Sequence, residues 1–123
     1  MQKIIFIVLL IICVISAEPI EIKHIEVFQN VLKQPNKLLV FDLYADWCKP
    51  CKMLDPILTE ISNENENVQF YRINIDSLPA IQQAFKANSI PFVAFFKNMQ
   101  YLDRLIGLYP KETYLKAIEV LDK

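Results

Sequence analysis

Apolar positions recur with two different spacings between residues 18 and 123, and each spacing predicts one kind of element. Predominantly apolar runs, which are typical of buried strands, occupy residues 38–44 and 92–96. Residues 68–75 are also expected to form a strand, and weaker strand patterns lie at 18–22 and 101–106. Apolar residues at helical spacing occupy residues 24–33, 50–62 and 78–87. A closing helix is expected from Pro110 onward, with an apolar core stripe formed by Tyr114, Leu115, Ile118 and Leu121. Strands and helices therefore alternate along most of the chain.

The order of these elements predicts one α/β domain with a mixed sheet. Strands joined through a helix run parallel, whereas the short turn over residues 97–100 joins two strands as an antiparallel hairpin. Pro56 lies inside the second helix, where its ring and its missing N–H are expected to kink the axis. With 123 residues, of which 54% are hydrophobic and 22% are charged, the chain suits a single packed core.

The amino-terminal segment differs from the rest of the chain and has the pattern of a secretory signal peptide. Lys3 precedes an unbroken apolar run over residues 4–15, and two small residues, of which Ala17 is the second, come before a polar start. The run is shorter than the roughly 20 residues that span a bilayer as a helix. The expected organisation is a signal peptide over residues 1–17 and a domain over 18–123, with an uncleaved membrane anchor as the alternative.

Charge and cysteine content narrow the possible functions. The formal net charge is −1 and Lys and Arg form no run, so nucleic-acid binding is not expected. Cys13 is expected to leave with the signal peptide, which leaves two cysteines in the domain. The predicted location is the periplasm, the endoplasmic reticulum lumen or the exterior of the cell, with membrane contact only if the segment is not cleaved.

The two remaining cysteines stand three residues apart in the stretch Trp47–Lys52, between a predicted strand and a predicted helix. Free N–H groups and the dipole at a helix start stabilise an anion, so Cys48 is expected to be a thiolate more often than an ordinary thiol. A thiolate is the species that attacks a disulfide. A bridge from Cys48 to Cys51 closes almost no chain, which disfavours a purely structural disulfide. The pattern therefore predicts a dithiol redox centre.

The succession of elements, with Trp-Cys-x-Pro-Cys-Lys at the first long helix and Ser-Ile-Pro before a late strand, resembles the thioredoxin family over residues 20–122. Six further features agree with that family: Asp42, Ala45, Trp47, Pro56, the strand end Asn74-Ile75-Asp76, and Gly107. The string over residues 43–48 is also similar to thioredoxin-like reductase domains of bacterial envelopes. The resemblance implies a thioredoxin fold, with a central mixed sheet of four to five strands flanked by about four helices, in a monomer.

The resemblance also implies roles for three residues of the redox centre. Cys48 is the attacking nucleophile at an exposed helix start, and Cys51, one turn later and beneath it, is the resolving thiol. Asp42 stands where the family keeps a buried carboxylate, whose raised pKa lets it take the proton from Cys51. The alternative for Asp42 is an ordinary carboxylate at a strand end, exposed to water.

A substrate groove beside the sulfurs follows from the same resemblance. Pro91 is expected to be a cis proline, although cis is rare for X-Pro bonds in general, and the backbone of Ile90 then offers hydrogen bonds to an extended substrate. Trp47 forms a flat apolar wall and Gly107 leaves room for the substrate. The alternatives are a core aromatic for Trp47 and an ordinary turn for Gly107. Lys49 and Pro50, between the cysteines, complete the set of expected substrate-binding residues.

Four positions depart from the usual pattern of the family. Lys49 stands where Gly is common and adds a cation beside the sulfurs. Arg72 stands where many members have Lys near the buried Asp. Because Arg keeps its proton, Arg72 is not expected to relay one. A salt bridge from Arg72 to Asp42 is expected to be within reach. Phe92 follows the proline where Thr is frequent, and Met99 replaces a hairpin glycine. Phe92 and Met99 suggest a specialised surface, whereas Lys49 is expected to affect the redox potential and the choice of partner.

The remaining chemistry of the chain does not favour another kind of site. One C-x-x-C and the single His24 do not supply the ligand set of a zinc site, and Lys52 follows Cys51 where haem attachment needs His. The sequence carries no nucleotide or flavin motif, so no cofactor is expected.

The predicted function is that of an enzyme: an exported thiol-disulfide oxidoreductase that reduces or exchanges disulfides in substrate proteins. The expected partners are those substrates and a reductase that delivers electrons. Two alternatives stay open. The first is a docking or assembly subunit of a secretion or folding complex that uses the same fold without redox turnover. The second is a disulfide oxidase or isomerase.

Overall fold

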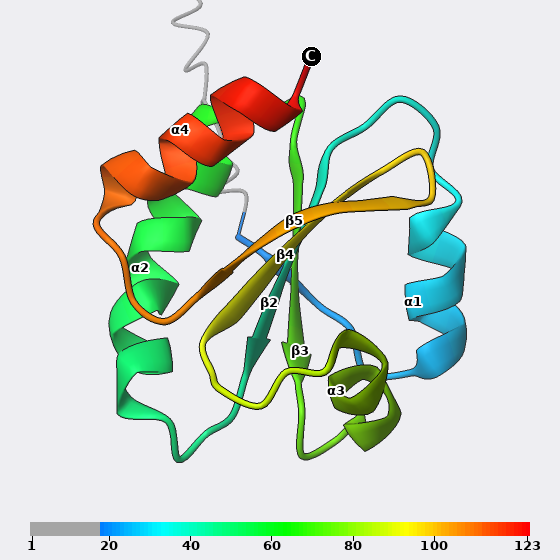
Figure 1. Cartoon of the computed structure of the whole chain (residues 1–123), viewed down its shortest axis with the longest axis vertical. Helices are drawn as coiled ribbons and strands as arrows, with labels where there is room; N and C mark the ends of the chain where they lie inside the picture. Colours follow the sequence, from blue (N-terminus) through cyan, green and yellow to red (C-terminus); the bar gives the residue numbers. More distant parts are fainter. Residues whose placement is uncertain (1–17) are drawn as a thin grey trace, which may run out of the picture.

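A five-stranded mixed sheet lies at the centre of the computed structural model, which describes residues 18–123 (Figure 1). The expected signal peptide over 1–17, with Cys13, lies outside the described residues. The strands are β1 (Ile20–Glu21), β2 (Leu39–Tyr44), β3 (Gln69–Asn74), β4 (Phe92–Lys97) and β5 (Gln100–Ile106). The helices are α1 (Ile25–Leu32), α2 (Lys49–Glu64), α3 (Pro79–Phe85) and α4 (Lys111–Leu121). Each expected element is present, and its bounds shift by a few residues at most.

The strand order is β1-β3-β2-β4-β5, so β2 lies in the middle of the sheet. It pairs parallel with β3, which it reaches through α2, and antiparallel with β4. In these pairs Leu43 lies opposite Phe92, and Phe92 lies opposite Ile106. The carboxyl end of β2, the amino end of β4 and the carboxyl end of β5 therefore meet at one end of the sheet. The residues that follow or precede these ends form the candidate site.

The two faces of the sheet carry separate hydrophobic clusters because neighbouring strand residues point to opposite sides. On one face, Phe28 of α1 and Ile81 of α3 pack with Phe41 of β2. On the other face, Leu54 of α2 and Tyr114 of α4 pack in a cluster with alternate residues of the same strands. Figure 1 shows α2 and α4 together on one side of the sheet and α1 and α3 on the other. The expected apolar stripe of α4 is confirmed, with Tyr114 and Ile118 buried and Leu115 and Leu121 packed beside them.

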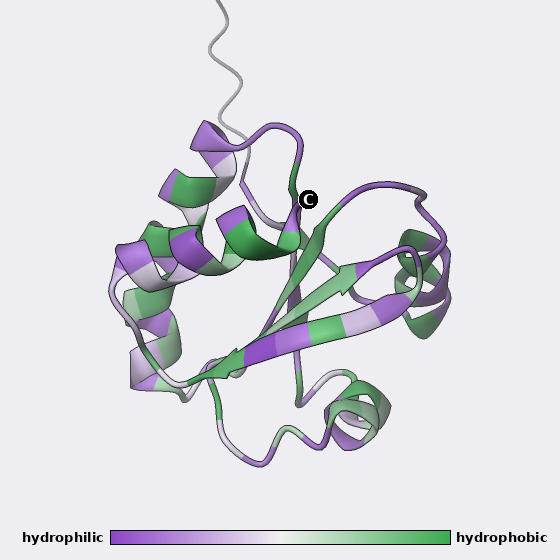
Figure 2. Ribbon diagram, turned by 45° about the horizontal axis from the view of Figure 1, so that its top comes forward, coloured by the Kyte–Doolittle hydropathy of each residue, from purple (hydrophilic) through white to green (hydrophobic). Residues whose placement is uncertain are grey.

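Two local features involve residues with special backbone preferences. Helix α2 contains Pro56, as expected, and runs on to Glu64. In the β4–β5 hairpin, Asn98 and Met99 both have positive φ, at 51° and 62°, which is the backbone of a two-residue turn that favours glycine. Strand β5 is largely exposed at the sheet edge, and Figure 2 shows its mixed polarity beside the hydrophobic β4. Among residues 18–123, no helix has both the length and the apolar character needed to cross a bilayer.

Candidate active site

Three loops meet at the end of the sheet where β2 and β5 finish and β4 begins. The first loop carries Cys48 into α2, the second contains Ile90 and Pro91, and the third contains Gly107. The backbone N–H of Gly107 donates a hydrogen bond to the carbonyl of Pro91 at 2.8 Å, which ties the second loop to the third. The sheet topology thus brings together residues that lie far apart in the sequence.

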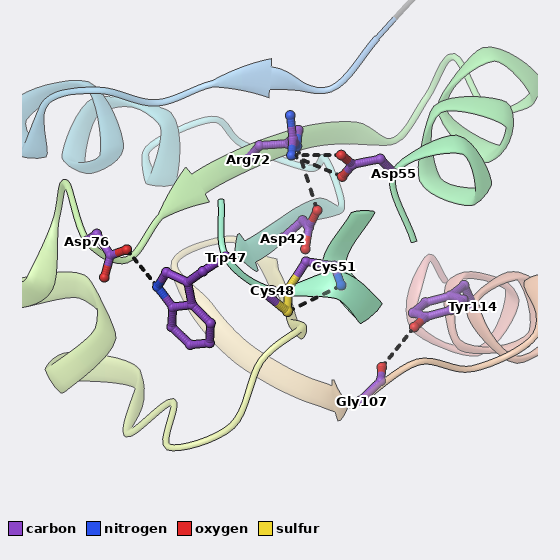
Figure 3. Close-up of a disulfide and its surroundings, with 9 residues drawn as sticks. All are labelled: Asp42, Trp47, Cys48, Cys51, Asp55, Arg72, Asp76, Gly107 and Tyr114. Atoms are coloured by element: carbon purple, nitrogen blue, oxygen red, sulfur yellow. Dashed lines mark hydrogen bonds and ion pairs between the residues drawn. A yellow bond between two sulfur atoms is a disulfide. The ribbon is translucent and has the colours of Figure 1, made fainter. Parts of the chain in front are cut away.

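The two cysteines are joined by a disulfide, with their Cα atoms 5.3 Å apart (Figure 3). Cys48 is the N-cap residue of α2, and the backbone N–H of Cys51 donates to its Sγ at 3.3 Å. The first turn of α2 therefore directs its N–H groups and the positive end of its dipole toward Cys48. On reduction this arrangement favours a thiolate at Cys48, because a helix start stabilises negative charge.

Cys48 is less accessible than expected. Its exposed fraction is 4%, against 1% for Cys51, so the expectation of an exposed Cys48 is wrong. The side chain of Cys48 belongs to a buried cluster with Ala45 and Phe92, and Ile90 packs against that cluster. The sequence placed Cys48 at a helix start, where the neighbouring Lys49 is indeed exposed, but it did not show that the side chain of Cys48 packs into this cluster. Attack by or on Cys48 is therefore restricted to a narrow approach.

Asp42 lies inside the protein, between the cysteine pair and Arg72 (Figure 3). With 1% of its surface exposed, the alternative of a water-exposed strand-end carboxylate is ruled out. Burial raises the pKa of Asp42 to about 7, and the attraction of Arg72 opposes that rise only in part. No group among residues 18–123 donates a hydrogen bond to either carboxylate oxygen. A carboxyl group in this setting can gain or lose a proton near neutral pH.

Arg72 bridges two carboxylates, although its stronger partner is not the expected one. Its Nη2 lies 3.0 Å from Asp55, whereas its Nε lies 3.8 Å from Asp42. The guanidinium also stacks over the ring of Tyr44, 4.0 Å from the centroid. The expected proximity of Arg72 to Asp42 follows from their opposed positions on β3 and β2. Asp55 was missed by sequence reasoning; its place one helical turn after Cys51 was the signal that could have found it.

A small cavity of about 80 Å³ lies beside this charged group, and Asp42, Asp55 and Arg72 line part of it. A polar cavity of this size has room for water. Burial raises the pKa of Asp55 as well, and Arg72 lowers it. The cavity therefore offers protons a polar route to Asp42 on the side of Arg72 and Asp55.

The expected groove residues come from the three loops at this end of the sheet. The Ile90–Pro91 peptide bond is cis, and among residues 18–123 no backbone hydrogen bond outside the helices and strands uses Ile90. Trp47 is 69% exposed, so it is not a core aromatic. Its indole Nε1 donates to Asp76 at 2.9 Å, which orients the ring at the surface (Figure 3). An extended peptide could therefore use the backbone of Ile90 and the face of Trp47.

Gly107 has φ of +102°, a backbone conformation that favours glycine, and a Cβ added there would meet no atom within 4 Å. The glycine is therefore required by conformation, and the space beside it is open. Its carbonyl accepts a hydrogen bond from the Tyr114 hydroxyl at 3.2 Å (Figure 3). This contact was not expected, since the sequence identified Tyr114 only as a core residue of α4.

No cluster of three or more His, Cys, Asp or Glu side chains suitable for a metal ion occurs within residues 18–123.

Comparison with known proteins gives a consistent result. The family model described as Thioredoxin matches residues 19–120. The chain belongs to the thioredoxin family. Thioredoxin H5 of Arabidopsis thaliana is 36% identical over 107 residues, covering 85% of this chain and 91% of the relative. A thioredoxin of Rickettsia bellii is 41% identical over 91 residues, covering 73% of this chain and 86% of the relative.

Solved thioredoxin structures agree with the fold. Oxidized mitochondrial thioredoxin 3 of Saccharomyces cerevisiae superposes with a TM-score of 0.77 at 30% identity, covering 84% of this chain and 95% of that one. Thioredoxin NaTrxh of Nicotiana alata gives a TM-score of 0.78 at 32% identity, with coverages of 85% and 96%. The expected thioredoxin fold is thereby confirmed. Members of this family are thiol-disulfide oxidoreductases, and the Cys48–Cys51 pair fits their redox-active pair.

Proposed function

We propose that this thioredoxin is exported and reduces disulfides in substrate proteins, with Cys48 as nucleophile, Cys51 as resolving thiol and Asp42 as proton acceptor. One observation carries the proposal: a disulfide at the amino end of α2 lies next to a buried carboxyl group whose pKa burial raises to about 7. A thiol that must be deprotonated needs a base whose pKa lies near the working pH.

The first step begins from the reduced protein. The Cys48 thiolate attacks one sulfur of the substrate disulfide, a mixed disulfide forms, and the other substrate sulfur leaves as a thiolate. The helix start favours Cys48 as the attacking group because the Cys51 N–H is directed at its Sγ.

The second step releases the substrate. Asp42 takes the proton of the Cys51 thiol, and the resulting thiolate attacks Sγ of Cys48. The Cys48–Cys51 bond forms, the mixed disulfide breaks, and the second substrate sulfur leaves as a thiolate that takes up a proton. Two electrons have passed from the protein to the substrate. The oxidised protein with protonated Asp42 can lose that proton through the polar cavity beside Arg72 and Asp55.

The groove residues hold the substrate during both steps. Ile90 supplies free backbone groups, Trp47 supplies an exposed apolar face, and the space beside Gly107 admits the chain of the substrate. Lys49 and Pro50 are exposed between the cysteines and border the approach to Cys48.

Export and electron supply complete the proposal. The segment over 1–17 has a signal-peptide pattern, and the family match begins only at residue 19, which supports a separate role for that segment. Turnover then needs a reductase that returns two electrons to the disulfide in the same compartment. Mass analysis of the processed protein is expected to find Glu18 at its amino terminus; an intact Met1 in a membrane fraction would indicate an uncleaved anchor instead.

The redox equilibrium of the protein in graded thiol buffers tests the proposed direction. Alkylation and mass report the Cys48–Cys51 bridge, and Trp47 fluorescence serves as a second probe. A reduction potential well below about −240 mV is expected for a reductase fed by a partner. A potential well above that value would indicate a disulfide donor or isomerase, and the absence of a reversible bridge would favour the docking role.

A further inference from the structure

An apolar pocket of about 660 Å³ lies on the face of the sheet that carries α1 and α3, and no expected site residue lines it. Rings of Phe28, Phe85, Phe96 and Tyr101 form much of its wall, with Lys86 and Arg104 also lining it. Pockets of this volume hold drug-sized ligands, which are larger than one amino-acid side chain. The pocket therefore has room for a short segment of a partner.

A β-bulge in the hairpin builds one wall of this pocket. Phe95 pairs with Asp103, but Phe96 pairs with Tyr101, so β5 contains one extra residue between these pairs. In a regular strand, residues three apart point to opposite faces. Because of the extra residue, Tyr101 lines the same pocket as Arg104 and Ile106.

The aromatic wall has a defined arrangement. The ring of Phe85 lies 5.4 Å from that of Phe96 and 5.9 Å from that of Tyr101, and the Phe96 and Tyr101 rings lie 5.0 Å apart. Such packing between rings contributes beyond simple burial and keeps the wall in one shape. Tyr101 nevertheless remains 42% exposed, which leaves apolar surface for a partner to cover.

The charges at this pocket have one sign. Lys86 and Arg104 are exposed, neither forms an ion pair with another residue of the described chain, and no Asp or Glu lines the pocket. The position of Lys86 is set by its backbone, which has φ of 54° at the end of α3 and donates to the carbonyl of Gln83. An occupant with a negative charge beside its apolar part would complement both features.

The pocket lies next in sequence to the proposed substrate groove. Ser89 and Ile106 line it, and these residues directly precede Ile90 and Gly107. A chain bound along Ile90 would reach the pocket within a few residues.

We infer that this pocket is a second recognition site for substrate proteins, and that it takes a segment with an aromatic or large aliphatic side chain next to an acidic one. The inference rests on the proposed function, because it concerns substrates of the same disulfide reduction. The apolar side chain packs against Phe85, Phe96 and Tyr101, while its acidic neighbour lies at Lys86 and Arg104. Substrates with such a segment near their disulfide are then reduced in preference to others.

Single-turnover reduction of synthetic cyclic disulfide peptides by the reduced protein tests this inference. Four peptides differ only beside the disulfide: Ala-Gln as reference, Phe-Glu on the amino side, Phe-Glu on the carboxyl side, and Phe-Lys on whichever side Phe-Glu is faster. The peptide with Phe-Glu on one side is expected to react about tenfold faster than the reference peptide. The Phe-Lys peptide is expected to react about threefold more slowly than that Phe-Glu peptide.

Variants of the pocket locate the effect. The double variant Lys86→Gln with Arg104→Gln is expected to reduce the rate with the Phe-Glu peptide to that with the Phe-Lys peptide. Ala84→Phe adds a ring at the pocket wall and is expected to reduce the rate with the Phe-Glu peptide to that with the reference peptide. Lys116→Gln, an exposed lysine of α4 away from the pocket, serves as the matched control and should change nothing. The rate with the reference peptide should stay constant throughout and shows that each variant is folded and active.

The outcomes separate the two proposals. Failure to reduce any peptide would overturn the proposed function, and the inference with it. Equal rates for all four peptides would overturn the inference alone. A Phe-Glu preference that survives in the pocket variants would place recognition elsewhere and would also overturn it. So would a dimer in solution that the same variants dissociate, because the pocket would then be a contact between copies.

Discussion

The cysteine pair of this thioredoxin lies between two regions of opposite character. On one side, Asp42 is buried beside the half-buried Arg72, and low dielectric around Asp42 makes its charge interactions strong. On the other side, the exposed ring of Trp47 and the open space beside Gly107 belong to the proposed substrate groove, in contact with solvent. Changes in the first region are expected to alter proton transfer and stability. Changes in the second are expected to alter which disulfides react and how fast.

The sulfurs themselves stand between these regions, so their loss has the largest expected effect. Cys48→Ser should reduce disulfide reduction by more than about 10³-fold, because no other thiol starts the reaction. Cys51→Ser should instead leave a mixed disulfide on Cys48 that mass analysis detects with both large and small substrates. Full activity of Cys48→Ser in cells would indicate a docking role in place of redox turnover.

The buried region is expected to dominate the pH dependence of stability. Burial raises the pKa of Asp42 from 3.8 in the unfolded chain to about 7, so the folded protein holds this proton more tightly. The contribution of this proton to the free energy of unfolding is complete below pH 3.8 and is lost as the pH rises through the folded-state pKa of about 7. From pH 5 to pH 8 this carboxyl alone should lower the free energy of unfolding by about 2–3 kcal/mol.

Asp42→Asn removes that titration and tests the assignment. Urea unfolding of the oxidised protein at the two pH values should show the loss in the wild type and little of it in the variant. Glu119→Gln, which neutralises an exposed carboxylate of α4, is the matched control and should retain the wild-type dependence. An unchanged pH dependence in Asp42→Asn would contradict a raised pKa at this carboxyl. The variant should also slow resolution by Cys51 by about 10²-fold.

The two neighbours of Asp42 should shift its titration in opposite directions. Asp55 raises the pKa of Asp42 by its charge and Arg72 lowers it. Asp55→Asn should therefore lower the pKa of Asp42, since Arg72 also becomes free to approach Asp42, and Arg72→Gln should raise it. A carboxyl NMR titration of each variant measures the shifts. Shifts of the same sign in both variants would refute this account of the charged group.

The two regions also differ in how far the sequence could predict them. The redox pair, Asp42 and the groove residues followed from a local motif and a family pattern, because spacing and residue type carry that information. Asp55 was not found, because its contact with Arg72 depends on where α2 lies against β3. The burial of Cys48 was likewise missed, since it depends on packing with residues distant in the sequence, such as Phe92 in the same cluster. The pocket at Arg104 depends on a bulge that no local pattern marks.

The open groove should yield the smallest effect, and it should concern large substrates more than small ones. Gly107→Ala meets no steric clash, but φ of +102° costs an alanine about 1 kcal/mol of stability. Reduction of a protein disulfide should slow by about threefold as the methyl group narrows the approach, whereas a small disulfide should react at the wild-type rate. Thermal unfolding and paired rate measurements give both quantities.

Met99→Gly is the complementary control, because it removes the strain of a non-glycine residue with φ of 62° in the hairpin turn. Met99 precedes β5, at the opposite end of the strand from Gly107. It should stabilise the protein by up to about 1 kcal/mol, as a glycine suits this turn, and leave both rates unchanged. The two variants thus separate backbone conformation from recognition. If the reduction rate changed with stability in both variants, falling in Gly107→Ala and rising in Met99→Gly, the groove would act only through the stability of the fold. A loss confined to Gly107→Ala and to the protein substrate would assign the space beside Gly107 to substrate binding.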